Sequence, residues 1–123
     1  MKILFLVCLL CSSNAVFANV IPLISTDNVL QVDPQKTLIL DVRSPDEFAE
    51  GHVPGAINIP HNEITQQLEL IKSFKQESIV LYCRSGRRAG IAASTLIEHG
   101  VTQLQHMDGD MLQWQAQQLP IEK

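Results

Sequence analysis

The sequence has 123 residues, of which 46% are hydrophobic, 18% charged and 5% aromatic, the size and composition of one globular domain. Nine Lys and Arg against thirteen Asp and Glu give a formal charge of −4. An acidic chain is a poor general nucleic-acid binder, because that affinity comes largely from basic side chains on phosphates. Three cysteines exclude a zinc site of two Cys-x-x-Cys pairs and a multi-disulfide framework.

Residues 1–18 have the pattern of a cleaved secretory signal peptide. Lys2 gives a positive start, residues 3–11 are continuously apolar, and Ala18 ends a short segment of small residues. The apolar stretch is far shorter than the roughly 20 residues that cross a membrane, so we expect no stable membrane span. A buried N-terminal helix or strand is the alternative. Cleavage after Ala18 would leave residues 19–123 as one periplasmic or secreted domain.

Strands and helices alternate in the first half of this domain. Residues 38–40 are an apolar run that predicts a buried strand. Residues 44–47, Ser-Pro-Asp-Glu, are a helix-start signal, and the short helix stops at Gly51. Residues 56–59 predict a second strand, and residues 62–71 predict a helix capped by Asn62.

The same alternation continues in the second half. Residues 78–82 predict the clearest strand, and a loop then leads into a helix that runs to His99. Residues 101–104 alternate like another strand, and Asp108 or Asp110 opens a last helix. Such alternation predicts an α/β fold with a parallel sheet, whose functional sites lie beyond the carboxyl ends of the strands.

Residues 83–88, Cys-Arg-Ser-Gly-Arg-Arg, occupy such a strand end. After signal cleavage Cys83 is the one remaining cysteine, so it is an inert buried thiol, an intermolecular partner or a reactive group. Arg84, Arg87 and Arg88 surround it with positive charge, and Gly86 allows the backbone to curl at a helix N-terminus. These surroundings favour a thiolate and an anion site over a solvated basic patch.

Two separated segments resemble the rhodanese family of sulfurtransferases. They are residues 41–60, which contain Asp-Val-Arg-Ser-Pro-Asp-Glu-Phe and Gly-His-Val-Pro-Gly-Ala, and residues 82–88, Tyr-Cys-Arg-Ser-Gly-Arg-Arg. A weaker third element comprises residues 108–109, Trp114 and residues 119–120. The resemblance covers nearly all of residues 19–123. With an export signal on one domain, the chain is most similar to the small periplasmic rhodaneses of the phage shock protein E type.

The resemblance implies a rhodanese-like α/β domain with a central parallel sheet of about five strands flanked by helices. It implies a persulfide on Cys83, held by the loop residues Arg84, Ser85, Gly86, Arg87 and Arg88. There are two departures from the family pattern. Ala89 stands where many members have Ser or Thr, and Asp110 stands where Gly is commoner.

Three charged residues of the first segment are interpreted as structural support. Asp41, at a strand end, is expected to accept hydrogen bonds from backbone near the active loop. Arg43 and Glu47 are expected to pair across the short helix. His52 belongs to a turn signature that the family uses for architecture. The remaining histidines are scattered, and no metal site is expected among His61, His99 and His106.

The favoured function is thiosulfate:cyanide sulfurtransfer through a Cys83 persulfide, with no cofactor or metal. Its partners are a small anionic sulfur donor such as thiosulfate and a thiophilic acceptor, either cyanide or a thiol. A cysteine phosphatase or arsenate reductase is the alternative enzyme, but these use Cys-x5-Arg, and that count lands on Ala89 instead of Arg88. A non-catalytic rhodanese module is a further alternative, although such modules commonly lack the cysteine.

We expect cleavage after Ala18 when the full chain is expressed in a bacterium with a general secretion pathway. Amino-terminal sequencing of the exported protein should begin at Asn19. A matched variant with Ala18→Arg should be processed poorly, because a signal cleavage site requires small residues. Exported protein that begins at Met1 would contradict the prediction.

Overall fold

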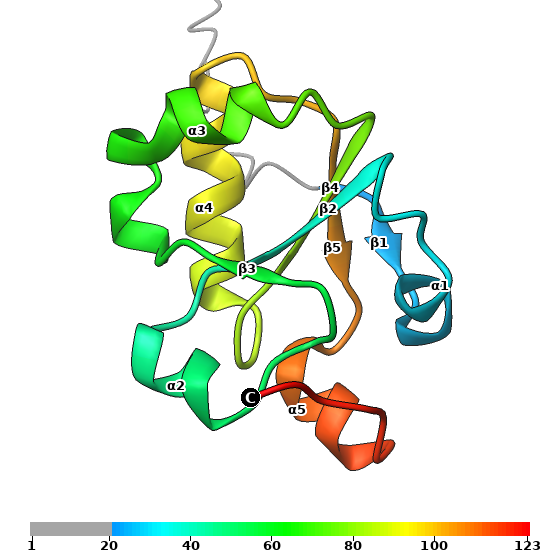
Figure 1. Ribbon diagram of the computed structural model, residues 1–123. Helices are drawn as coiled ribbons and strands as arrows, with labels where there is room; N and C mark the ends of the chain where they lie inside the picture. The colour runs from blue at the N-terminus through cyan, green and yellow to red at the C-terminus, as the bar shows by residue number, and fades with distance from the viewer. Residues whose placement is uncertain (1–20) are drawn as a thin grey trace, which may run out of the picture.

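A five-stranded parallel sheet lies at the centre of the computed structural model, which describes residues 21–123 (Figure 1). The strand order is β1-β5-β4-β2-β3, and every pair of neighbours is parallel. The strands are β1 (Leu23–Ile24), β2 (Thr37–Asp41), β3 (Ile57–Asn58), β4 (Ser78–Tyr82) and β5 (Leu104–Met107). This confirms the predicted α/β class and the five-stranded parallel sheet.

Helices cover both faces of the sheet, as a parallel sheet requires. Helices α3 and α4 pack on one face, and α1 and α5 lie on the other (Figure 1). The helices are α1 (Thr26–Leu30), α2 (Pro45–Glu50), α3 (Leu68–Ser73), α4 (Arg87–Glu98) and α5 (Asp110–Ala116), with 3₁₀ turns at His61–Glu63 and Thr65–Gln67.

The central strand β4 divides the interior into two cores. Ile79 and Leu81 point to the core that includes Ala92 and Leu96 of α4. Val80 and Tyr82 point the other way, into a core that includes Trp114 of α5. Successive strand residues face opposite sides of a sheet, so a strand buried on both faces is apolar throughout. This explains why residues 78–82 gave the clearest strand prediction.

Helix α2 begins and ends where the sequence indicates. The Ser44 side chain accepts a hydrogen bond from the backbone N–H of Glu47, and the Glu47 carboxylate accepts one from the backbone N–H of Ser44. Pro45 occupies the first turn, and Gly51 follows the last residue with φ at +151°. This capping box satisfies N–H groups that the helix cannot satisfy itself, and it also fixes the position of Glu47.

Two predicted elements are wrong in their bounds. Residues 101–104 are not a strand, because Gly100 takes φ +82° and the N–H of Val101 bonds back to the carbonyl of Leu96 after α4. The strand therefore starts only at Leu104, where pairing with Ile79 begins. Residues 62–71 are not one helix either, since two 3₁₀ turns precede α3.

The short elements β1 and α1 were not predicted. Each has at most five residues, which is too short to show a hydrophobic period. The predicted signal peptide lies outside the described residues. Among residues 21–123, no helix is long and apolar enough to cross a membrane.

Candidate active site

Cys83 directly follows β4, at the side of the sheet where the carboxyl ends of β4 and β2 lie. The residue is 1% exposed, and its Sγ accepts a hydrogen bond from the backbone N–H of Gly86 at 3.0 Å. Gly86 precedes α4 and has φ +115°, a conformation that L residues with a side chain rarely adopt. The glycine therefore lets the loop curl so that an amide points at the sulfur.

The loop ends at the N-terminus of α4, a helix of 12 residues. The first-turn N–H groups of a helix have no acceptor within it, and they carry a partial positive charge. Helix α5 holds the other side of the loop, because the N–H groups of Met111 and Leu112 donate to the carbonyls of Cys83 and Arg84 at 3.0 and 3.1 Å. The structure thus brings Cys83, Arg84, Ser85 and Gly86 together in one loop, which continues into Arg87 and Arg88 in the first turn of α4.

The three arginines of the loop have different surroundings. Arg84 and Arg87 are exposed to solvent. Arg88 forms two hydrogen bonds to the Glu47 carboxylate, at 2.6 and 3.0 Å, and both side chains are partly buried. The hydrogen bond from Arg88 lowers the pKa of Glu47 to about 2, and the same contact raises the pKa of Arg88. This pair ties the loop to the start of α2.

The predicted Arg43–Glu47 pair is wrong. Arg43 instead turns back onto Asp41, with Nε 3.0 Å from Oδ1 and Nη2 2.7 Å from Oδ2, and it also donates to the carbonyl of Gly51. The partner of Glu47 is Arg88, which comes from the start of α4. Burial by itself lowers the pKa of Arg43, but the hydrogen bond and charge of Asp41 outweigh it and raise that pKa.

Asp41 has partners other than those predicted. It accepts hydrogen bonds from the backbone N–H of Arg43 at 2.9 Å and from the Tyr82 hydroxyl at 2.7 Å, rather than from the Cys83 loop. Burial, followed by the charge of Asp41, raises the pKa of Tyr82, so this hydroxyl stays protonated. Asp41 is therefore a structural acceptor that joins β2 to β4, one residue before Cys83.

The carboxylate that does contact the Cys83 loop is Asp110, which the sequence reasoning missed as a site residue. Its Oδ1 accepts the backbone N–H of Cys83 at 2.9 Å, and both oxygens lie within 3.0 Å of Nε2 of His106. The hydrogen bond to Asp110 raises the pKa of His106. The sequence feature that could have identified this role was the aspartate at position 110, where glycine is commoner in the family.

His52 occupies a structural position, as expected from its turn. Its Nδ1 lies 2.8 Å from the Phe48 carbonyl, and its ring stacks on the Phe48 ring with centroids 3.6 Å apart. Within residues 21–123, no three His, Cys, Asp or Glu side chains gather as a metal site.

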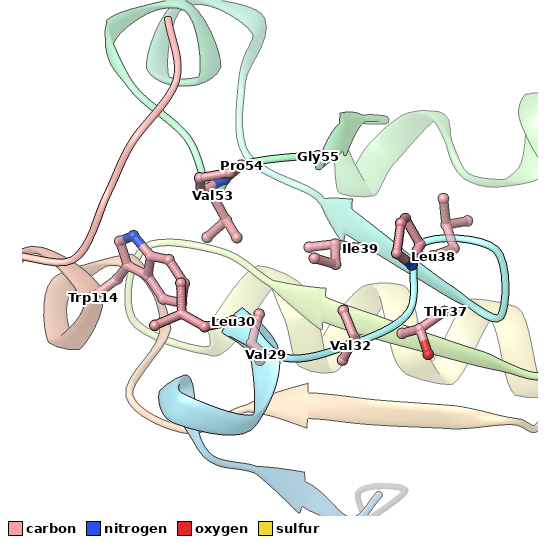
Figure 2. Close-up of a pocket in the computed structure, with 11 residues that line it drawn as sticks. Val29, Leu30, Val32, Thr37, Leu38, Ile39, Val53, Pro54, Gly55 and Trp114 are labelled. Atoms are coloured by element: carbon pink, nitrogen blue, oxygen red, sulfur yellow. The ribbon is translucent and has the colours of Figure 1, made fainter.

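Two hollows in the surface have different relations to the loop. One of about 260 Å³ lies beside Arg88, between Ser44 and His61. The other, of about 220 Å³, is lined by apolar side chains that include Val53, Ile39 and Trp114, and it has no charged residue (Figure 2). The first hollow includes Arg88, and the second includes none of residues 83–88.

A model of the family described as "Rhodanese-like domain" matches residues 26–117. A sulfurtransferase of Allochromatium vinosum is 33% identical over 89 residues, covering 72% of this chain and 81% of the relative. The thiosulfate sulfurtransferase PspE of Escherichia coli is 36% identical over 70 residues, covering 57% of this chain and 67% of the relative.

Structural superposition also covers most of the chain. A rhodanese-related protein of Thermoplasma volcanium superimposes with a TM-score of 0.69 at 21% identity, covering 82% of this chain and 97% of that one. A related segment also occurs in the longer tRNA uridine(34) hydroxylase of Pectobacterium carotovorum, at 28% identity, with 32% of that protein covered. The domain therefore occurs in proteins with different reactions.

Glu47→Gln should destabilise the protein at neutral pH by about 1 kcal/mol or less, because a partly exposed ion pair contributes little. The folded pKa of Glu47, about 2, lies below its ordinary value of 4.5. The contribution of the pair is therefore complete above pH 4.5 and is lost as the pH falls towards 2. Urea unfolding at pH 7 and pH 3 should show the difference between parent and variant shrinking.

Glu50→Gln is the matched control, since it removes an exposed carboxylate from the same helix. It should leave the pH dependence of stability close to that of the parent. An equal loss in both variants at both pH values would show that the Arg88 contact does not stabilise the fold.

Proposed function

The chain belongs to the rhodanese family, and we propose that it is a thiosulfate sulfurtransferase that carries sulfur as a persulfide on Cys83. The observation that carries the proposal is the amide of Gly86 aimed at Sγ of Cys83 from a loop at the start of α4. A thiolate or persulfide is anionic, and amides at a helix N-terminus stabilise an anion there. The sulfurtransferase names of two relatives support the same reaction.

In the first half-reaction the Cys83 thiolate attacks the outer sulfur of thiosulfate. A new S–S bond forms at Sγ, the S–S bond of thiosulfate breaks, and sulfite leaves with the electron pair. Loop amides stabilise the charge on the outer sulfur. The exposed Arg84 and Arg87 favour the approach of a dianion.

In the second half-reaction an acceptor removes the outer sulfur. The carbon of cyanide, or the sulfur of a thiolate, attacks the persulfide, and the Cys83 thiolate leaves with the electron pair. Two half-reactions joined by a covalent intermediate produce ping-pong kinetics. The low exposure of Cys83 favours small reactants over bulky ones.

The size of the loop favours sulfur over phosphate. Gly86, three residues after Cys83, already bonds to Sγ, so the loop curls tightly around one atom. Arg88 is bound by Glu47 and does not extend over the sulfur as a free cation. A phosphatase would need space for a tetrahedral oxyanion above Sγ.

Cys83→Ser should abolish sulfur transfer while the protein stays folded, because a serine hydroxyl cannot hold a persulfide and is nearly isosteric. Parent protein mixed with thiosulfate should gain the mass of one sulfur atom in intact-mass analysis. Cyanide should then remove that mass and release thiocyanate. The variant should do neither, and its circular dichroism should match that of the parent.

Hydrolysis of an aryl phosphate, measured beside thiocyanate formation, tests the alternative enzyme. Robust phosphatase activity of the parent without thiocyanate would overturn the proposal. An inert parent, with neither activity and no added sulfur, would support the non-catalytic alternative.

A further inference from the structure

His106 and Asp110 form a pair directly behind the Cys83 loop. Asp110 is 2% exposed, and its Oδ1 accepts the backbone N–H of Cys83 at 2.9 Å. Nε2 of His106 lies 2.9 and 3.0 Å from its two oxygens. A Cβ built on Gly86 would be 3.2 Å from Oδ2 of Asp110 and 3.5 Å from Cε1 of His106. The pair therefore lies beside the glycine whose amide donates to the sulfur.

An aspartate at this position is costly in two ways. Its φ is +55°, in the left-handed region that glycine adopts without strain. Its carboxylate is also withdrawn from water, and a buried charge is stable only where it is paired and hydrogen-bonded. A glycine would avoid both costs, but it would leave the N–H of Cys83 without this acceptor.

We propose that His106 and Asp110 are positioning residues that set the charge behind the Cys83 loop according to the protonation of His106. This inference concerns the same site as the proposed sulfurtransferase reaction and rests on it for its biological meaning. With His106 protonated, the pair is neutral overall. With His106 neutral, one uncompensated negative charge remains on Asp110.

The hydrogen bond between His106 and Asp110 remains when His106 loses a proton. The side chain of His106 is 23% exposed, so the ring can release a proton from Nδ1 to solvent while Nε2–H still donates to Asp110. The geometry therefore stays the same in both states, and only the net charge changes. The hydrogen bond to Asp110, helped by the charges of Asp110 and Asp108, raises the pKa of His106.

The sign of the effect follows from the charge of the reactants. A negative charge behind the loop disfavours the Cys83 thiolate, the persulfide anion and the approach of thiosulfate. The reaction with thiosulfate is therefore favoured below the pKa of His106 and weakened above it. This fall opposes the gain that the thiol makes by ionising as the pH rises.

The other charged groups around His106 and Asp110 do not offset the negative charge of Asp110. Arg84 and Arg87 are exposed and screened by solvent, and Arg88 is neutralised by Glu47. Strand β1, which pairs with His106 through Leu23, has no charged residue. Asp108, which also acts on His106, is acidic and more exposed than Asp110.

Two variants isolate the two charge states. Asp110→Asn keeps an oxygen for the N–H of Cys83, tolerates positive φ and removes the charge. His106→Gln keeps a side-chain N–H donor but cannot be protonated, so the charge of Asp110 stays uncompensated. The thiol pKa of Cys83, measured from the pH dependence of iodoacetamide alkylation, should be lower in Asp110→Asn than in His106→Gln.

We expect the difference in thiol pKa to be about half a unit to one unit, which is about a three- to tenfold difference in alkylation rate below both pKa values. The parent should lie between the two variants. Asp108→Asn, an exposed charge on the same connection, is the matched control and should shift the thiol pKa less. Identical thiol pKa values in the two main variants would overturn the inference.

A second measurement does not require either variant to fold. By linkage, if the two groups are coupled, the pKa of His106 in an NMR titration must be higher in the persulfide form of the parent than in Cys83→Ser. Equal His106 pKa values in the two proteins would also overturn the inference. Iodoacetamide is neutral and needs no sulfur donor, so alkylation tests the charge pair even if the parent fails to react with thiosulfate.

Discussion

The buried carboxylate of Asp41 is the constraint on which this structure depends. It is 0% exposed, and a charge so far from water must be fully hydrogen-bonded. Arg43 satisfies it through three side-chain contacts and its backbone N–H, and the Tyr82 hydroxyl donates to it as well. The Tyr82 hydroxyl in turn accepts the N–H of Val53. One carboxylate therefore fixes β2, β4 and the turn before β3 relative to each other, and Cys83 is the residue that follows.

A second buried carboxylate, Asp110, anchors the opposite side of the same sheet edge. It reaches the backbone of Cys83, as Asp41 reaches the side chain of the preceding Tyr82. Each carboxylate has one basic partner on its own segment, Arg43 for Asp41 and His106 for Asp110. The two partners differ in one important respect, because an arginine stays protonated whereas a histidine titrates near neutral pH.

The Cys83 loop is held mainly by contacts from the neighbouring helices. Glu47 on α2 binds Arg88, and α5 donates two backbone N–H groups to the carbonyls of Cys83 and Arg84. Within the loop, the amide of Gly86 contacts the sulfur. A nucleophile in a loop held by two neighbouring helices needs little rearrangement when it reacts, and preorganised donors of this kind act on developing charge without reorganisation.

The sequence by itself determined the α/β class, the position of the Cys83 loop after β4 and the bounds of α2, because these depend on local periodicity and on capping residues. The number of five strands was implied by the family resemblance, since β1 is too short to show a periodic pattern. Local sequence patterns gave wrong element bounds in two places. The start of β5 is set by a distant contact, the pairing of Leu104 with Ile79. The region from residue 62 to 71 forms two 3₁₀ turns before α3 instead of one helix. The partners of charged residues were decided only by the tertiary structure. Arg43 and Glu47 are four residues apart, yet each found a different partner, and Asp110 gained its role from lying behind Cys83. Burial sets these choices, because a charge removed from water binds whichever opposite charge the packed elements bring within reach, and sequence separation carries no information about that distance.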